Sequence, residues 1–326
     1  MKKKVIVYRK IHSDLLERLQ RHFHTVVISP DDSDAFYAEL KTADGLIGSH
    51  LQVDKQLLDR APNLKLVSNI SVGYDNLDLE EMNKRGIMAT NTPGVLTDTT
   101  ADTIFGLMLA AARRFTELDN YVKSGQWTGK LSEEYFGVDV HHKTLGIIGM
   151  GRIGTAIAER GRFGFRMNIL YYNRSRNKEA EEWLQAEYVS LRELLERSDF
   201  VCVMAPLTEE TVHLIGKEEF ALMKPTAVFV NGSRGKLVDE EALVDALQNG
   251  KIRAAGLDVY EQEPIDPNHP LLRMNNVVTL PHIGSATAET RYKMAALAVE
   301  NVIKGLSGEL PPGLVNQEVL EMETKR

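Results

Sequence analysis

The chain has 326 residues, of which 43% are hydrophobic and 26% charged, and its formal net charge is −7. At roughly 100 to 200 residues per domain this length predicts two domains, and the composition predicts packed domains rather than disorder. The acidic balance argues against a nucleic-acid partner, which would require clustered lysine and arginine.

The single cysteine and the N-terminal residues indicate in which cellular compartment the protein is expected. Cys202 lies in the apolar run 200–204, which predicts a buried thiol rather than a nucleophile. The basic residues 2–4 resemble the start of a signal peptide, but Arg9 and Lys10 interrupt the apolar stretch that follows. No window approaches the roughly 18 apolar residues of a membrane span. We therefore expect a cytoplasmic protein without a membrane partner.

Short apolar segments alternate with helical patterns along the chain. The strand candidates are residues 5–8, 45–48, 66–69, 145–149, 168–172, 200–204, 227–231, 254–258 and 277–280. Helical spacing occurs at residues 14–23, 100–114, 178–184, 191–198 and 239–249, and Gly250 ends the last of these. Strands that alternate with helices form parallel sheets, so the sequence predicts a doubly wound α/β fold.

A glycine-rich motif follows the fourth strand candidate. Residues 145–154, LGIIGMGRIG, run from a strand through G-x-G-x-x-G into a helix. Gly149 permits the tight turn, Gly151 lets a pyrophosphate approach the backbone, and Gly154 allows close helix–strand packing. A glycine-rich turn without a ligand is the alternative, but the flanking strand and helix favour a dinucleotide. We expect cofactor contacts at Gly149, Gly151, Arg152, Ile153 and Gly154.

The next strand candidate ends at residues 172–176, YNRSR, where an NAD enzyme places an acid on the ribose 2′-hydroxyl. Here Asn173 replaces the acid and does not repel a 2′-phosphate. Arg174 and Arg176 are suited to bind that phosphate, and Ser175 to donate a hydrogen bond. A solvated basic loop is the alternative. We therefore expect NADP(H) to be preferred, with NAD(H) as a possible second cofactor.

Three polar groups each begin where a predicted strand ends, at residues 231–235, 258–264 and 281–284. The carboxyl ends of the strands in a doubly wound sheet form the ligand crevice. Arg234, Glu263 and His282 are therefore expected to converge beside the cofactor. Singly, they also fit a surface salt bridge, a turn acid and a strand-end cap, so the prediction depends on their joint placement.

These three residues match the needs of 2-keto acid reduction. Arg234 can bind the substrate carboxylate with two parallel hydrogen bonds, which lysine would not reproduce. His282 can protonate the carbonyl oxygen, and Glu263 on the other ring nitrogen would favour the imidazolium and orient it. The expected substrate is thus a small 2-keto acid, or the 2-hydroxy acid in reverse.

Ordered motifs over almost the whole chain resemble the D-isomer-specific 2-hydroxyacid dehydrogenase family. The matching segments are residues 71–75, 149–154, 205–208, 231–235, 256–259 with 263–264, and 281–284. The resemblance implies a Rossmann cofactor domain at 99–289, inserted into a flavodoxin-like substrate domain built from 1–98 and 290–326. The apolar helix at 99–114 is placed to carry the chain between them. The family resemblance also implies a homodimer, with contacts around 121–140.

The same resemblance implies further site residues. Backbone N–H groups at Val72 and Gly73 are expected to help Arg234 hold the substrate carboxylate. The positions that line the family's cofactor site correspond to Thr103, Leu207, Gly232, Ser233, Asp258 and Gly284. Asp102 stands where many family members carry a glutamate, so no role is assigned to it.

Within the family, residues 70–78, 139–145 and 282–291 are most similar to bacterial glyoxylate/hydroxypyruvate reductases of the 2-ketogluconate reductase type. The implied substrates are glyoxylate, hydroxypyruvate and 2-keto-D-gluconate. His141 and His142 suggest a metal, but adjacent residues of an extended segment point to opposite sides, and we expect no metal site.

Two alternatives remain open at this point. NAD-sensing corepressors share the fold and much of the triad, but they usually carry interaction tails, and this chain has only a short charged end at 321–326. Another D-2-hydroxyacid dehydrogenase, such as a D-lactate dehydrogenase, is the second alternative.

Overall fold

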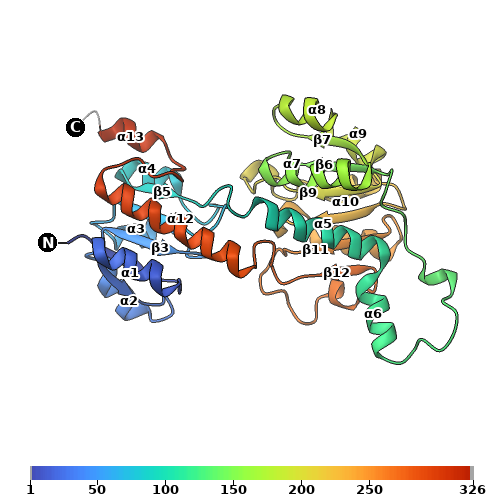
Figure 1. Cartoon of the computed structure of the whole chain (residues 1–326), viewed down its shortest axis with the longest axis horizontal. Helices are drawn as coiled ribbons and strands as arrows, with labels where there is room; N and C mark the ends of the chain where they lie inside the picture. The colour runs from blue at the N-terminus through green and yellow to red at the C-terminus, as the bar shows by residue number, and fades with distance from the viewer. Residues whose placement is uncertain (1, 324–326) are drawn as a thin grey trace. The chain divides into compact units, whose positions relative to one another are not determined.

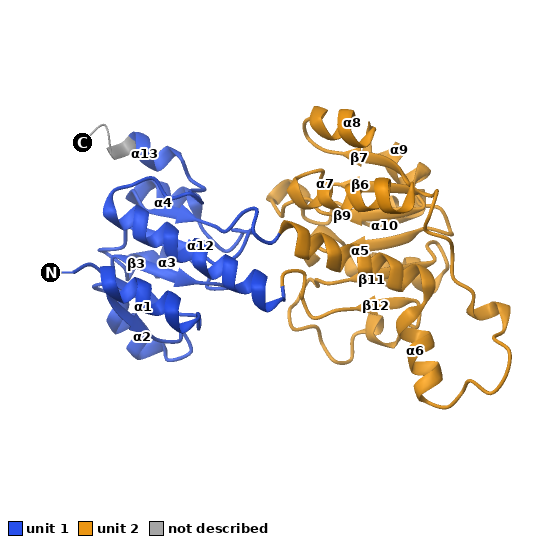
Figure 2. Ribbon diagram, viewed as in Figure 1, with its two compact units in different colours: residues 1–96, 286–326 blue, residues 97–285 orange. Residues whose placement is uncertain are grey.

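The computed structural model describes residues 2–323. The chain divides into two compact units (Figure 2). Unit 1 contains the described residues up to Leu96 and from Ala286 onward, and unit 2 runs from Thr97 to Ser285. Each unit has one parallel sheet with helices between the strands (Figure 1), which confirms the predicted α/β class. Which unit binds substrate stays a prediction.

Unit 1 has a five-stranded parallel sheet in the order β2-β1-β3-β4-β5, the order of flavodoxin-like folds. Its strands are β1 (Lys4–Val7), β2 (His24–Val27), β3 (Gly45–Gly48), β4 (Leu66–Asn69) and β5 (Met88–Thr90). Its helices are α1 (Ser13–His22), α2 (Ser33–Leu40), α3 (Lys55–Asp59), α4 (Leu79–Arg85), α12 (Ala288–Ser307) and α13 (Glu318–Glu323). The long helix α12 packs on β3, β4 and β5, so the C-terminal part of the chain completes the N-terminal sheet.

Unit 2 has a seven-stranded parallel sheet in the order β12-β11-β10-β9-β6-β7-β8. Its strands are β6 (Thr144–Ile148), β7 (Asn168–Tyr172), β8 (Glu187–Tyr188), β9 (Phe200–Val203), β10 (Val228–Asn231), β11 (Ala254–Leu257) and β12 (Val277–Thr279). The strand order reverses between β6 and β9. In doubly wound sheets a dinucleotide binds outside the carboxyl ends of the strands at this reversal.

Helices cover both faces of the second sheet. The longer ones are α5 (Thr97–Arg113), α6 (Phe115–Lys123), α7 (Arg152–Glu159), α8 (Lys178–Leu184), α9 (Leu191–Arg197), α10 (Lys217–Leu222) and α11 (Glu240–Gln248). The short ones are η1 (Glu133–Tyr135), η2 (Arg160–Gly164), η3 (Glu209–Thr211), η4 (Gly235–Leu237) and η5 (Pro270–Arg273). Helix α11 agrees closely with the predicted 239–249: Asp239 caps its start, and Gly250 follows its end with φ +65°.

Successive strand residues of unit 2 enter two different hydrophobic cores. Ile147 of β6 belongs to the core under α5 and α7, whereas Ile148 belongs to the core under α9, α10 and α11. Cys202 and Val203 of β9 alternate in the same way. A strand buried on both faces reads as a continuous apolar run, which is why these central strands were recognisable in the sequence. Cys202 is buried, and burial raises its pKa to about 12.

Every predicted strand is present, but the sequence misses β2, β5 and β8. All three lie at sheet edges. An edge strand has one neighbour and needs little apolar sequence; β8 has only two residues, Glu187 and Tyr188, and both are exposed. These three strands therefore lack the apolar run that marks the central ones.

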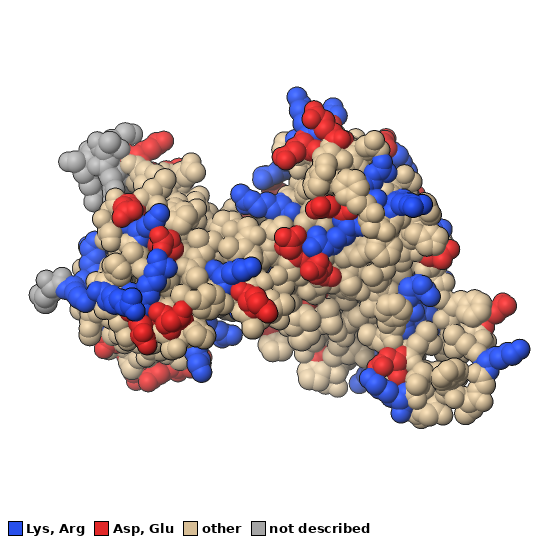
Figure 3. All heavy atoms as spheres, viewed as in Figure 1, with Lys and Arg blue, Asp and Glu red and all other residues tan. Residues whose placement is uncertain are grey.

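The surface carries both signs of charge. On the face shown in Figure 3, lysine and arginine are interspersed with aspartate and glutamate on each unit. Among the described residues, no helix is both long and apolar enough to cross a membrane.

Candidate active site

The glycine-rich turn joins β6 to α7. Gly149 has φ +103°, and a Cβ there would lie 2.5 Å from the amide nitrogen of Ala205. A Cβ on Gly154 would lie 2.2 Å from the carbonyl oxygen of Gly149, whereas a Cβ on Gly151 would meet no atom within 4 Å. Packing within the protein therefore requires the first and third glycines, and the middle one leaves the turn approachable. The first N–H groups of α7 have no acceptor inside the helix, so the turn fits a pyrophosphate.

Two asparagines after β7 hold the middle of this turn. The Met150 N–H donates to Asn173 Oδ1 (2.8 Å), and Asn177 Nδ2 donates to the Met150 carbonyl oxygen (3.1 Å). Asn177 also caps α8 by accepting from the Ala180 N–H. The glycine-rich turn and the segment after β7 are thus fixed to each other. The sequence analysis did not identify Asn177, although an asparagine before a helical pattern is an N-cap signal.

The residues expected to bind a 2′-phosphate differ from one another in their side-chain contacts. Arg174 and Ser175 are exposed, and their side chains make no hydrogen bond or ion pair with another described residue. Arg176 instead donates to both carboxylate oxygens of Glu181 (2.9 and 2.6 Å). The hydrogen bonds from Arg176 and then from the Tyr171 hydroxyl lower the pKa of Glu181 to about 2. Glu181 therefore balances the charge of Arg176, whereas the charge of Arg174 is not paired with a described carboxylate.

Arg234, Glu263 and His282 follow the carboxyl ends of three neighbouring strands, β10, β11 and β12. His282 Nδ1 lies 2.7 Å from Glu263 Oε2. Burial alone would raise the pKa of Glu263, but the hydrogen bond and charge of His282, the hydrogen bond from the Tyr260 N–H and the charge of Arg234 together bring it below its ordinary value. The fold therefore places an acid–imidazole pair and a guanidinium at one edge of the sheet.

Asp258 holds the backbone beside His282. Its carboxylate accepts from the N–H groups of Ile283 (2.7 Å) and Gly284 (2.8 Å). His282 itself has φ +53°, a conformation that is uncommon for a residue with a side chain. Asp258 is only 1% exposed, and burial raises its pKa. The buried carboxylate thus stabilises an unfavourable turn that sets the direction of the imidazole.

A buried asparagine shapes the loop of Arg234. Asn231 Nδ2 donates to the Arg234 carbonyl oxygen (2.9 Å), and Asn231 Oδ1 accepts from the Ser233 N–H (3.2 Å). A Cβ on Gly232 would lie 2.0 Å from Ile104 of α5, so this glycine is needed for helix–strand packing. The side chain of Asn231 therefore fixes the backbone that leads to Arg234, while Gly232 lies against α5.

The remaining predicted cofactor residues lie in unit 2 near these loops. Thr103 Oγ1 donates to the Gly284 carbonyl oxygen (3.4 Å), and Ser233 Oγ donates to the Ala205 carbonyl oxygen. Leu207 is partly buried in the segment after β9. Arg152 and Ile153 form the first turn of α7. Their cofactor contacts stay predictions.

Val72 and Gly73, the predicted substrate-binding residues of unit 1, lie in the loop directly after β4. Their backbone N–H groups donate to no acceptor among the described residues. Two adjacent amides without partners are suited to bind an anion.

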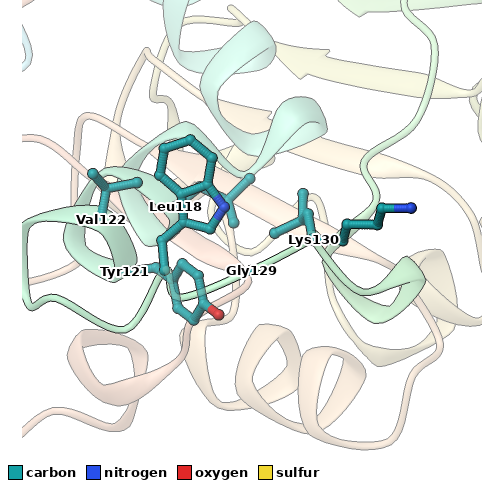
Figure 4. A pocket seen from close by; sticks show the side chains of 7 residues that line it. Leu118, Tyr121, Val122, Gly129 and Lys130 are labelled. Atoms are coloured by element: carbon teal, nitrogen blue, oxygen red, sulfur yellow. The ribbon is translucent and has the colours of Figure 1, made fainter.

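Apolar side chains are exposed on the segment 115–136 of unit 2. Trp127 is 61% and Phe136 is 53% exposed. A cavity of about 440 Å³ opens on this segment (Figure 4), and its lining residues are Leu118, Tyr121, Val122, Trp127, Gly129, Lys130 and Leu131. Apolar residues that gather at one exposed place indicate a binding surface.

Residues 105–284 match a family model described as D-isomer specific 2-hydroxyacid dehydrogenase, NAD binding domain. Two curated relatives, both called glyoxylate/hydroxypyruvate reductase B, match over 324 residues. The protein of Shigella boydii serotype 4 is 53% identical and that of Escherichia coli (strain SMS-3-5 / SECEC) is 52% identical; each match covers 98% of this chain and 100% of the relative.

Solved structures are similar over the same length. A protein from Thermus thermophilus has a TM-score of 0.88 and 41% identity, with 96% of this chain and 99% of that one covered. An NADPH-dependent glyoxylate/hydroxypyruvate reductase from Sinorhizobium meliloti, solved with NADP and malonate, has a TM-score of 0.88 and 36% identity, with 98% of each chain covered.

Proposed function

Because this chain belongs to the D-isomer-specific 2-hydroxyacid dehydrogenase family, we propose that it reduces small 2-keto acids to D-2-hydroxy acids, with NADPH as the preferred cofactor. The substrates are glyoxylate and hydroxypyruvate, which appear in the names of its relatives, and 2-keto-D-gluconate. The observation that carries the proposal is the 2.7 Å contact between His282 and Glu263 at the strand ends that also present Arg234.

Arg234, Glu263 and His282 each have a separate role in carbonyl reduction. Arg234 binds the substrate carboxylate, and the free amides of Val72 and Gly73 bind it as well. Since Glu263 occupies Nδ1 of His282, the other ring nitrogen, Nε2, donates the proton to the carbonyl oxygen. Glu263 stays ionised and stabilises the imidazolium until the proton is transferred. A reduced nicotinamide, when bound, supplies the hydride to the carbonyl carbon.

The cofactor preference rests on the residues after β7. Asn173 is engaged with Met150 and adds no negative charge. Arg174 and Ser175 are exposed, and Arg174 makes no ion pair with another described residue. They bind the 2′-phosphate of NADPH, which NADH lacks.

Steady-state oxidation of NADPH with each of the three keto acids tests the proposal, and the same panel with NADH tests the preference. We expect turnover, a higher kcat/KM with NADPH, and a kcat lower by about 10²- to 10⁴-fold in His282→Ala. A protein that binds NADPH but turns over none of these acids would favour the cofactor-sensing alternative. Pyruvate as the best substrate would favour a D-lactate dehydrogenase.

The protein also forms a homodimer in this proposal, through the region around 121–140, which overlaps the apolar segment 115–136. Exposed Trp127 and Phe136 would be buried by a second copy, and most soluble oligomers are symmetric pairs of one chain. The cavity beside Tyr121 gives the second copy a recess to fill (Figure 4).

A further inference from the structure

Residues 71–74, here called the amide loop, follow β4 in unit 1. The first three carbonyl oxygens of this loop each accept one hydrogen bond from the end of β4 or from the residues just after β5: Ser71 O from the Thr92 N–H (2.9 Å), Val72 O from Asn91 Nδ2 (2.8 Å) and Gly73 O from Asn69 Nδ2 (2.9 Å). The three carbonyl oxygens therefore all face the ends of β4 and β5.

This arrangement fixes the direction of the amide groups. Among the described residues the only cis peptide joins Glu263 and Pro264, so the peptides of the amide loop are trans. In a trans peptide the C=O and the following N–H point in opposite directions. The N–H groups of Val72, Gly73 and Tyr74 therefore point away from the strands, and none donates to a described residue. Three successive amides that share one direction are suited to bind an oxyanion.

The two asparagines are themselves rigid. Asn69 is 1% and Asn91 is 9% exposed. Asn69 Nδ2 also donates to Asn76 Oδ1 (3.1 Å), and the Asn91 backbone pairs with Gly313 and with the buried side chain of Asn301. Their side chains have little freedom to turn, so the amide loop is held in place before any ligand arrives.

We propose that Asn69 and Asn91 are positioning residues for the substrate: by holding the carbonyls of Gly73 and Val72, they present the amides of Val72, Gly73 and Tyr74 to the substrate carboxylate. The inference rests on the proposed function, because it takes that carboxylate as the ligand. It adds a third amide, from Tyr74, and two side chains that touch no substrate atom.

Asn91→Ala tests this role through a split between kinetic constants. Without the Asn91 donor the Val72 carbonyl is released, and the neighbouring amide loses its direction. We expect the KM for glyoxylate to rise by about tenfold, with a smaller change in kcat and no change in the KM for NADPH. Calorimetric binding of malonate, a small dicarboxylate that is not reduced, is expected to weaken by the same factor.

Asn316→Ala is the matched control. Asn316 is as buried as Asn69, and it bonds to Ile87, the residue before β5, and to Ala89 in the middle of that strand, but to no residue of the amide loop. We expect this variant to lose thermal stability, as Asn91→Ala does, but to keep its malonate affinity and its KM for glyoxylate. Equal weakening of malonate binding in both variants would overturn the proposal, as would unchanged binding in a folded Asn91→Ala protein.

The isosteric variant Asn91→Asp adds a pH readout. Its carboxyl group can donate to Val72 O only while it is protonated, so the KM for glyoxylate is expected to approach the wild-type value as the pH falls. If the ratio of the Asn91→Asp KM to the wild-type KM does not vary with pH, Asn91 does not act as a hydrogen-bond donor to Val72 O. If the wild-type chain binds malonate but turns over no keto acid, the proposed function fails, and the positioning role stands only if Asn91→Ala weakens malonate binding and Asn316→Ala does not. If the wild-type chain does not bind malonate, the amide loop is not a carboxylate site.

Discussion

Gly235 lies directly against the backbone of Tyr260: a Cβ on Gly235 would lie 1.8 Å from the Tyr260 carbonyl carbon. The loop that carries Arg234 and the loop that carries Glu263 therefore touch without any side chain between them. A second link joins the same segments, since the Glu261 N–H donates to Glu240 Oε1 (2.8 Å) and the Glu240 N–H donates to Glu261 Oε1 (3.2 Å).

Gly235→Ala is expected to displace both catalytic loops, because the clash is with backbone and no flexible side chain can move aside. We expect kcat/KM for glyoxylate to fall by about 10²-fold and the free energy of unfolding to fall by about 1–3 kcal/mol. Gly164→Ala is the control, since a Cβ there meets no atom within 4 Å. Full activity in Gly235→Ala would show that contact between the two loops is not needed.

Glu263→Gln tests the acid–imidazole pair through the pH profile. The pKa of Glu263 lies below its ordinary value, so the carboxylate stays ionised as the pH falls through the usual glutamate range, and the pairing is lost only at lower pH. Glutamine carries no charge that can be lost, so the fall of kcat/KM on the acid side that follows protonation of Glu263 is expected to disappear in the variant. At neutral pH kcat is expected to fall by about tenfold or more, because the imidazole loses its anionic partner. An acid limb that persists unchanged in Glu263→Gln would contradict the pairing role.

Asp258→Asn tests the support of the turn at His282. Asparagine keeps one acceptor but turns an NH₂ group toward either Ile283 or Gly284, so one of the two hydrogen bonds is lost. We expect kcat to fall by about ten- to a hundredfold, with little change in the KM for NADPH. A KM for NADPH that rises by as large a factor as kcat falls would indicate that Asp258 contributes to cofactor binding instead.

Arg174→Ala and Arg176→Ala are expected to differ in cofactor selectivity. Glu181 already balances Arg176, so removing Arg174 is expected to reduce kcat/KM for NADPH more, by about ten- to a hundredfold, and to leave NADH nearly unchanged. Lys178→Ala, an exposed cation on the same segment, controls for general charge. Equal falls in kcat/KM for NADPH in the two arginine variants would show that pairing with Glu181 does not keep Arg176 from the phosphate.

Trp127→Lys is expected to shift the protein from dimer to monomer in analytical ultracentrifugation, because it places a charge in the apolar segment 115–136. Trp183→Lys is the control: Trp183 is 48% exposed but lies in α8, outside that segment. Dissociation caused by Trp183→Lys alone would move the predicted interface to α8.

The parts of the site that the sequence analysis recognised depend on short segments. The glycine motif at 145–154 combines a strand, a turn and a helix in ten residues, and one of its glycines is explained by a contact within the motif, Gly154 against Gly149. Asn173 to Arg176 were found because their distance along the chain from this motif is fixed by one β-α-β unit. The edge strands were missed because they lack apolar runs.

Individual side-chain contacts were not accessible in this way, even between near neighbours in the chain. Glu181 appeared in the sequence only as part of a helix, and its pairing with Arg176, five residues away, distinguishes Arg176 from Arg174. Asn69 looked like an ordinary strand end and Asn91 lay outside every predicted element, although parallel pairing of β4 and β5 brings both to one loop.

The sequence by itself determined the α/β class and the family, and it predicted that Arg234, Glu263 and His282 form one set, because apolar runs, glycine turns and strand-end residues are local signals. Only the tertiary structure decided how these residues are held: Asp258 under the turn of His282, Gly235 against Tyr260, and Asn91 behind the amide loop. The physical reason is that a hydrogen bond or a close backbone contact depends on angstrom-scale distances between strands, and chain spacing does not record these distances.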